Sequence, residues 1–167
     1  MNKETFDWNK HLKEALDRTE FMAISTLGSN GTWTCPVQFS YDKNINLYFK
    51  SMPHSRHMEN LSKNPNISVA IFNTNRINDD DDVNGIQLSG NAEILKSKES
   101  IEEAAKHHYE RNEPGIDYME KVDKHLGDEA VWNFVKIIPD EIWLFDTRYF
   151  DEETEGRQRV PDEIFKK

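Results

Sequence analysis

The fold is constrained most by a series of short apolar segments, each about the length of one β-strand and separated from the next by turn residues. Residues 20–27 and 32–41 flank the sequence GSNG, which favours a tight turn, so these two segments predict a β-hairpin. Further strands are expected at residues 45–51, 67–73 and 85–95. Five closely spaced strands favour an antiparallel barrel or sandwich over a parallel sheet that alternates with helices.

Proline and glycine residues refine the expected sheet. Pro36 cannot donate a backbone hydrogen bond, so its strand should lie at an edge or contain a bulge. Gly90 indicates a bulge, or the close approach of another backbone, in the fifth strand. Nearer the carboxyl end, residues 130–138 and 141–150 are expected to form the last two strands, divided by Pro139 and Asp140.

Three segments have helical periodicity or composition. Residues 6–18 place apolar side chains on one helical face, residues 97–111 are rich in Glu, Lys and Ala, and residues 118–126 form a weaker helical segment that ends at Gly127. The expected fold class is therefore mainly β with flanking helices (α+β). A length of 167 residues suits one domain, which we expect to span residues 1–150, followed by a charged C-terminal tail or arm at residues 151–167.

Charge and composition exclude several classes of protein. The net charge of −10 disfavours nucleic acid and anionic membranes as main partners, because both require a basic surface. No segment approaches the roughly 20 apolar residues that a membrane span needs, and the N-terminus does not resemble a signal peptide. The single cysteine, Cys35, cannot form an intramolecular disulfide, so a reducing, cytoplasmic location fits best.

One region of this acidic chain is basic. Between Lys43 and Asn78 there are five basic residues and one acidic residue. Within this region a strand ends at Lys50 and Ser51, and Ser55 is placed to cap a short helix. Unpaired backbone N–H groups at such a helix start favour anions, and Lys50, Ser51, Ser55, Arg56 and His57 would surround that position. These residues predict a site for a phosphate monoester.

The same residues have a simpler interpretation. In this interpretation Ser55 caps a surface helix and binds no phosphate, while Arg56 and Lys63 are solvated on the outer face of that helix. The spacing of these residues does not decide between the two interpretations.

A family resemblance favours the phosphate site. The P-V-x-F pattern at Pro36–Phe39, followed by L-Y-F, S-R-H and N-P between Leu47 and Pro65, resembles the FMN-binding split-barrel proteins related to pyridoxamine 5′-phosphate oxidase. The resemblance covers residues 20–95 and, more loosely, 134–146. It implies an antiparallel split β-barrel and an FMN cofactor. Because a small open barrel leaves edges and a ring-sized cleft that a second copy would close, we expect a homodimer with FMN in the groove between the subunits. Residues 1–150 would then be the FMN-binding split-barrel domain.

The resemblance also implies which residues contact FMN. The phosphate would be held at Lys50, Ser51, Ser55, Arg56 and His57. The flavin ring would lie along the backbone of the second strand. It would also be approached from the fifth strand at Gln87 and from the neighbouring subunit at Trp143 or Phe145. The residues implied there are Thr34, Pro36, Val37, Gln38, Gln87 and Trp143.

The sequence departs from the family pattern at two places. The family often has Lys where this chain has His57, which could make one phosphate contact weaker or pH-dependent. The carboxy-terminal signature with which the true oxidases hold the pyridoxal ring is not recognisable, so oxidation of vitamin B6 is not expected.

The function expected is that of an FMN-dependent oxidoreductase acting on an unknown small-molecule substrate or electron acceptor, with a nicotinamide cofactor as one candidate donor. The flavin carries such chemistry, so no catalytic acid, base or nucleophile is assigned. Two alternatives are open: a non-catalytic flavin-binding or stress-related module, and a barrel that holds another phosphorylated ligand or a haem-like carboxylate.

Other polar residues are assigned no chemistry. The acidic run Asp79–Asp82 lacks the spacing of a cation site, so no metal is expected. His107, His108 and His125 are expected at the surface. Cys35 is expected to be a packed strand residue rather than a redox-active thiol.

Overall fold

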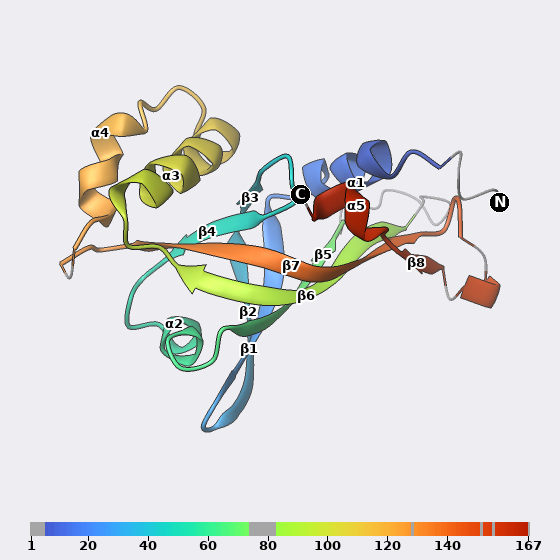
Figure 1. The fold of residues 1–167 in the computed structure, drawn as a ribbon, viewed down its shortest axis with the longest axis horizontal. Coiled ribbons are helices and arrows are strands. Elements are labelled where there is room, and N and C mark those ends of the chain that lie inside the picture. Colours follow the sequence, from blue (N-terminus) through green and yellow to red (C-terminus); the bar gives the residue numbers. More distant parts are fainter. Residues whose placement is uncertain (1–5, 74–82, 128, 151, 155, 167) are drawn as a thin grey trace.

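The computed structural model describes residues 6–73, 83–127, 129–150, 152–154 and 156–166, which form one curled antiparallel sheet with helices around it (Figure 1). The strand order is β2-β1-β5-β6-β7-β4-β3, and β8 pairs with β7. The strands are β1 (Phe21–Gly28), β2 (Gly31–Gln38), β3 (Ser40–Tyr41), β4 (Leu47–Ser51), β5 (Asn66–Phe72), β6 (Asn84–Ile94), β7 (Asn133–Asp146) and β8 (Arg157–Arg159). This arrangement confirms the expected split barrel with flanking helices.

The first hairpin and its edge strand are confirmed. Gly28 and Gly31 pair across the β1–β2 turn, and Gly31 has a φ of +90°, in the left-handed region that glycine readily adopts. β2 is the first strand of the sheet order, so Pro36 lies in an edge strand. The missing N–H of Pro36 is therefore tolerated at that edge.

The end of the sheet differs from expectation. One 14-residue strand, β7, replaces the two strands predicted at residues 130–138 and 141–150, and it continues through Pro139. The register of β6 against β7 shifts between Ser89 and Gly90, so that Gly90 pairs with Pro139 while Ser89 pairs with Glu141. The extra residue at this bulge lets the ladder pass the proline without breaking. The bulge that Gly90 predicted is confirmed.

The helices before residue 150 follow the expected segments. They are α1 (Trp8–Asp17), α2 (Arg56–Leu61), α3 (Lys98–Asn112), α4 (Met119–Val122) and the 3₁₀ turn η2 (Asp123–His125). The 3₁₀ turn η3 (Glu152–Thr154) and α5 (Asp162–Phe165) lie in the segment for which no helix was predicted. The Ser97 side chain caps α3 by accepting a hydrogen bond from the N–H of Ser100. None of the helices in the described part of the chain is long and apolar enough to cross a membrane.

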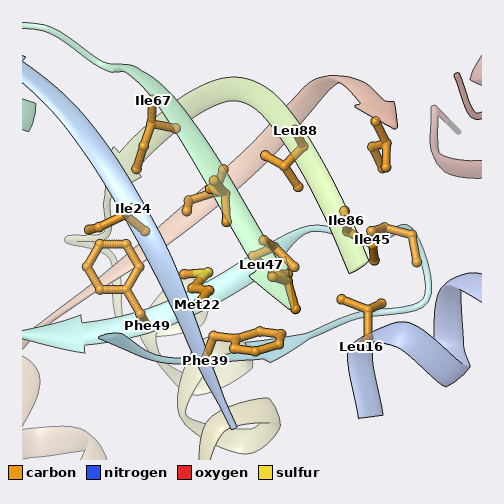
Figure 2. Packing of buried hydrophobic residues seen from close by; sticks show 14 of the residues in the cluster. Leu16, Met22, Ile24, Phe39, Ile45, Leu47, Phe49, Ile67, Ile86 and Leu88 are labelled. Carbon is orange, nitrogen blue, oxygen red and sulfur yellow. The ribbon is translucent and has the colours of Figure 1, made fainter. Parts of the chain in front are cut away.

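The main core fills the inside of the curled sheet (Figure 2). Alternate residues of β1, including Met22 and Ile24, point inward and pack with Phe39, Phe49 and residues of β5 and β6. α1 closes this core through its buried face, which includes Leu16. The interior of the curled sheet is thus filled by packed apolar side chains.

The segment after residue 150 packs on the protein's own barrel. β8 pairs with β7, and Val160 and Phe165 are buried in the main core. The sequence predicted a charged tail or arm here, but two apolar side chains and a strand ladder hold the described part of this segment on the barrel. The division of the chain at residue 150 stays a prediction.

A second, smaller core lies between α3 and the sheet. Two histidines that we expected at the surface are buried beside it: His108 is 0% exposed and His125 is 4% exposed. That expectation is wrong because α3 turns its His108 face onto Phe134 of β7, where the two rings lie 5.7 Å apart. His107 is half-buried and stacks on Tyr48.

Candidate functional site

The candidate site lies at the seam of the split barrel. β2 lies against β4, yet the two strands are not neighbours in the hydrogen-bonded sheet. β4 ends at Ser51, and the chain then turns into α2, which packs on β1 and β2. This connection carries Ser51, Ser55 and His57 to the inner face of the edge strand β2.

Two hydroxyls and an imidazole converge at the seam. His57 Nε2 lies 2.7 Å from Ser51 Oγ and 3.1 Å from Ser55 Oγ, and the two serine oxygens are 3.3 Å apart. Ser55 occupies the expected N-cap position of α2, but its side chain makes no capping hydrogen bond. The hydroxyl is turned toward His57 instead. We call Ser51, Ser55 and His57 the seam cluster.

The imidazole of His57 also contacts Cys35 of β2, with 3.3 Å between Nδ1 and the sulfur. Burial lowers the pKa of His57 and raises the pKa of the Cys35 thiol. Both side chains are therefore neutral near pH 7. His57 links the thiol to the two serine hydroxyls without adding a charge, which disfavours a reactive thiolate at Cys35.

Arg56 lies between Ser55 and His57 in the sequence and brings a positive charge to this segment. Its guanidinium carbon lies 4.4 Å from the centre of the Trp33 ring, and one guanidinium N–H donates to the carbonyl oxygen of Asn30 at 3.5 Å. Sequence reasoning did not connect Trp33 with the site. Trp33 lies two residues before Cys35 on the same face of β2, and that period-2 spacing is the signal that would have found it.

Lys50 does not join the seam cluster. Successive side chains of a strand point to opposite faces, so Lys50 leaves β4 on the face opposite to Ser51. Its ammonium lies 2.9 Å from Glu113 Oε1 and 4.6 Å from the centre of the Tyr109 ring.

The residues predicted to contact the flavin ring are divided between two faces of the sheet. Thr34, Gln87 and Trp143 line one hollow of about 410 Å³ on the outer face, beside small side chains of β1 and β5. Pro36 pairs with Ala23, which lines the same hollow, and Gln38 pairs with Phe21 at the end of the hairpin. Val37 is 9% exposed and packs into the main core, so only its backbone is available to a ligand.

The seam cluster and Arg56 suit a phosphate monoester. Serine hydroxyls and a guanidinium are hydrogen-bond donors to phosphate oxygens, and the neutral imidazole can donate from one nitrogen. Thr34, on the outer face, is the neighbour of Cys35, which contacts the cluster on the inner face. A ligand that passes around the edge of β2 would therefore reach both places.

The acidic run Asp79–Asp82 and Arg76 lie outside the described residues, so the structure adds nothing to their assignment.

Comparisons with known proteins agree with this architecture. The family model described as pyridoxamine 5′-phosphate oxidase matches residues 9–136. No curated protein matches the sequence.

Solved structures with the same fold carry different descriptions. A heme binding protein from Mycobacterium smegmatis is similar with a TM-score of 0.71 and 15% identity; the match covers 96% of this chain but only 60% of that protein. A Bacteroides thetaiotaomicron protein assigned provisionally to 5-nitroimidazole antibiotic resistance matches with a TM-score of 0.66, 14% identity and 82% of each chain. The heme storage protein HutZ from Vibrio cholerae matches with a TM-score of 0.63 and 14% identity, over 82% of this chain and 94% of that one. At these identities the likeness establishes the fold alone.

Proposed function

The chain belongs to the pyridoxamine 5′-phosphate oxidase family, and from that premise we propose that it binds FMN at the barrel seam and serves as a flavin-dependent oxidoreductase. The proposal keeps residues 1–150 as the FMN-binding domain. It places the protein in the cytoplasm, in line with its single cysteine.

One observation carries this proposal: the seam cluster and Arg56 collect phosphate-binding groups at an open edge of the sheet. Ser51 Oγ, Ser55 Oγ and His57 Nε2 lie within 3.3 Å of one another. A structural role for Ser55 as a helix cap would orient its hydroxyl toward the backbone of α2, and it does not do so.

Each residue has a defined role in the proposed site. The hydroxyls of Ser51 and Ser55 donate to phosphate oxygens, His57 orients both hydroxyls, and Arg56 supplies the charge while the Trp33 ring holds its guanidinium in place. Thr34, Gln87 and Trp143 shape the hollow that would receive the ring. FMN, when bound, supplies hydride and electron transfer, and the protein supplies orientation and electrostatics.

The proposed assembly is a homodimer. The outer face of the sheet exposes Phe21, Leu27 and Phe72 by 54%, 50% and 54%, around the hollow described above. A second copy on this face would bury these side chains and enclose the ring site. The proposed reaction partners are a small-molecule electron acceptor and a nicotinamide donor.

Absorption spectroscopy of the purified protein tests the cofactor. Flavin bands, with FMN identified by mass after heat release, are expected. Reduction of the bound flavin by NADH or NADPH, followed by reoxidation in air, would distinguish an oxidoreductase from the alternative of a non-catalytic flavin-binding module. A protein that takes up no FMN in a titration would refute the proposal.

Haem is the second candidate ligand. It is favoured by one observation: two of the similar structures are described as a heme binding and a heme storage protein. A Soret band in the purified protein, in place of flavin bands, would select haem.

A further inference from the structure

A pocket of about 630 Å³ lies on the other side of β4 from the seam cluster. It is bounded by α3, by the α4–η2 segment and by the residues that lead into β7. Lys50 and Tyr109 contribute to its wall, and exposed apolar side chains of Ile116, Val131 and Trp132 line it as well. This size is within the usual range of about 300–1,000 Å³ for sites of small organic molecules.

Two nitrogen atoms lie near one carboxylate oxygen at the wall of this pocket. Glu113 Oε1 lies 2.9 Å from the ammonium of Lys50, which lines the pocket with it, and 3.9 Å from Nε2 of His108, which is buried behind Glu113 and does not itself line the pocket. Two nitrogen atoms thus face one oxygen, and only Lys50 is at hydrogen-bonding distance from it.

The protonation of His108 follows from its neighbours. Asn112 Nδ2 donates to the carbonyl oxygen of Phe39 at 3.2 Å, and the same nitrogen lies 3.1 Å from His108 Nδ1. Nδ1 must therefore accept that bond, which leaves the proton of the neutral ring on Nε2. Burial and the charge of Lys50 lower the pKa of His108 to about 4, so the ring is neutral near pH 7.

Nε2 of His108 is thus a buried donor without a hydrogen-bond partner among the described residues. The side chain of His108 is 1% exposed, so leaving this donor unpaired is unfavourable. Glu113, in contrast, lies at the end of α3 with a 38% exposed side chain, and its carboxylate can turn into solvent without leaving a buried charge.

We propose that this pocket binds an organic monocarboxylate with an apolar body, whose carboxylate replaces that of Glu113 and bonds both Lys50 and His108. The apolar body lies against Trp132 and Ile116. Glu113 acts as an internal competitor for the anion. This site is independent of the proposed FMN site, because Lys50 and the seam cluster lie on opposite faces of β4.

The remaining charges of the lining do not alter the class of ligand. Lys121 and Lys124 are balanced by Asp123 and Glu129. Selection of an anion therefore depends on the two donors at Glu113 rather than on the net charge of the pocket.

Calorimetric titration of the full chain with 2-naphthoate, and with the neutral analogue 2-naphthamide, tests the site. In the parent protein the acid should bind at least about tenfold more tightly than the amide, the value of one hydrogen bond to a charged group. Equal affinity for the two probes, or no binding of either at millimolar concentration, would overturn the proposal.

Two variants should shift the affinity in opposite directions. Lys50→Met should remove the preference for the acid, whereas Glu113→Gln should strengthen acid binding about threefold to tenfold by removing the competing anion, with the amide unchanged. Lys106→Met is the matched control: it removes the same charge from an exposed position of α3 and should change neither affinity.

A Glu113→Gln variant that bound the acid more weakly than the parent would also overturn the proposal. FMN uptake by Lys50→Met should equal that of the parent, so a loss of naphthoate binding can be separated from a failure of the proposed flavin site.

Discussion

Arg56 supplies the charge of the proposed phosphate site from an exposed side chain that the Trp33 ring holds at 4.4 Å. Because a hydrogen bond to a charged group contributes about 1.5–3 kcal/mol, Arg56→Ala should weaken FMN binding by roughly 10-fold to 150-fold. Riboflavin, which lacks the phosphate, should bind almost as before. Fluorescence titration of both ligands measures the difference.

Lys98→Ala is the control for this prediction, because it removes a charge from the exposed start of α3. It should leave both affinities unchanged. If the folded Arg56→Ala variant bound FMN within about twofold of the parent, Arg56 would be only a solvated residue of α2.

His108 makes the stability of the protein depend on pH. The unfolded chain binds a proton at this residue below about pH 6.5, whereas burial and Lys50 lower the folded-state pKa to about 4. The contribution of neutral His108 to the free energy of unfolding is therefore complete above the pKa of the unfolded state. It is lost as the pH falls from about 6.5 to about 4. The difference between the unfolded-state and folded-state pKa of His108 corresponds to about 3 kcal/mol of unfolding free energy.

His108→Gln cannot titrate and should reduce the loss of unfolding free energy between about pH 7 and about pH 4.5, measured by urea denaturation. The pKa of Glu14 is held at about 2 by hydrogen bonds from Arg148, so this carboxyl acts only at lower pH. His54→Gln, at an exposed position, should keep the pH dependence of the parent. An unchanged slope in His108→Gln would contradict the assignment.

At the scale of elements, the bulge between β6 and β7 depends on Gly90. A Cβ at this position would lie 2.3 Å from the carbonyl oxygen of Ile138, which belongs to the backbone of β7 and cannot move aside alone. Gly90→Ala should therefore destabilise the protein by about 1–3 kcal/mol, as overpacking does in closely packed sites.

The midpoint of urea denaturation measures this effect. Ser89→Ala is the control, because Ser89 lies beside the bulge on the outer face and should change stability by less than about 1 kcal/mol. Equal stability of the two variants would show that β7 moves freely at the bulge and that the close contact is not rigid.

Strand β4 shows how one element can serve two sites. Ser51 joins the seam cluster and Lys50 joins the pocket under α3, although the two residues are adjacent in sequence. The basic region predicted that both residues hold one phosphate, whereas the period-2 alternation of a strand places adjacent side chains on opposite faces. In β4 both faces are largely buried, so no alternation is visible in the sequence.

For the whole molecule, the outer face of the sheet determines the expected assembly. Phe72→Glu places a charge among the exposed apolar side chains of this face, and should shift the proposed homodimer toward monomer by at least about tenfold in dissociation constant. Light scattering over a range of protein concentrations measures the change. Met119→Glu is the control, because the Met119 side chain is 49% exposed on α4, away from this face; this variant should remain dimeric. A monomeric parent protein with FMN bound would contradict the shared groove.

The sequence by itself determined the family, the first hairpin, strands β4, β5 and β6 and helices α1 to α4, because these depend on local chemistry. The turn at Gly28–Gly31, the edge position of Pro36 and the bulge at Gly90 each follow from what one residue type can or cannot do in a backbone. The basic region also placed Ser51, Ser55 and His57 together correctly, since they lie within seven residues of one another.

Only the tertiary structure decided which faces meet. The approach of β2 to α2 brings Cys35 to His57 and Trp33 to Arg56 across more than twenty residues of sequence. The packing of α3 buries His108 and directs Lys50 to Glu113. Such long-range contacts are set by the curl of the sheet and the closure of the core, which no local pattern encodes, and for this reason the second pocket could be found only in the folded protein.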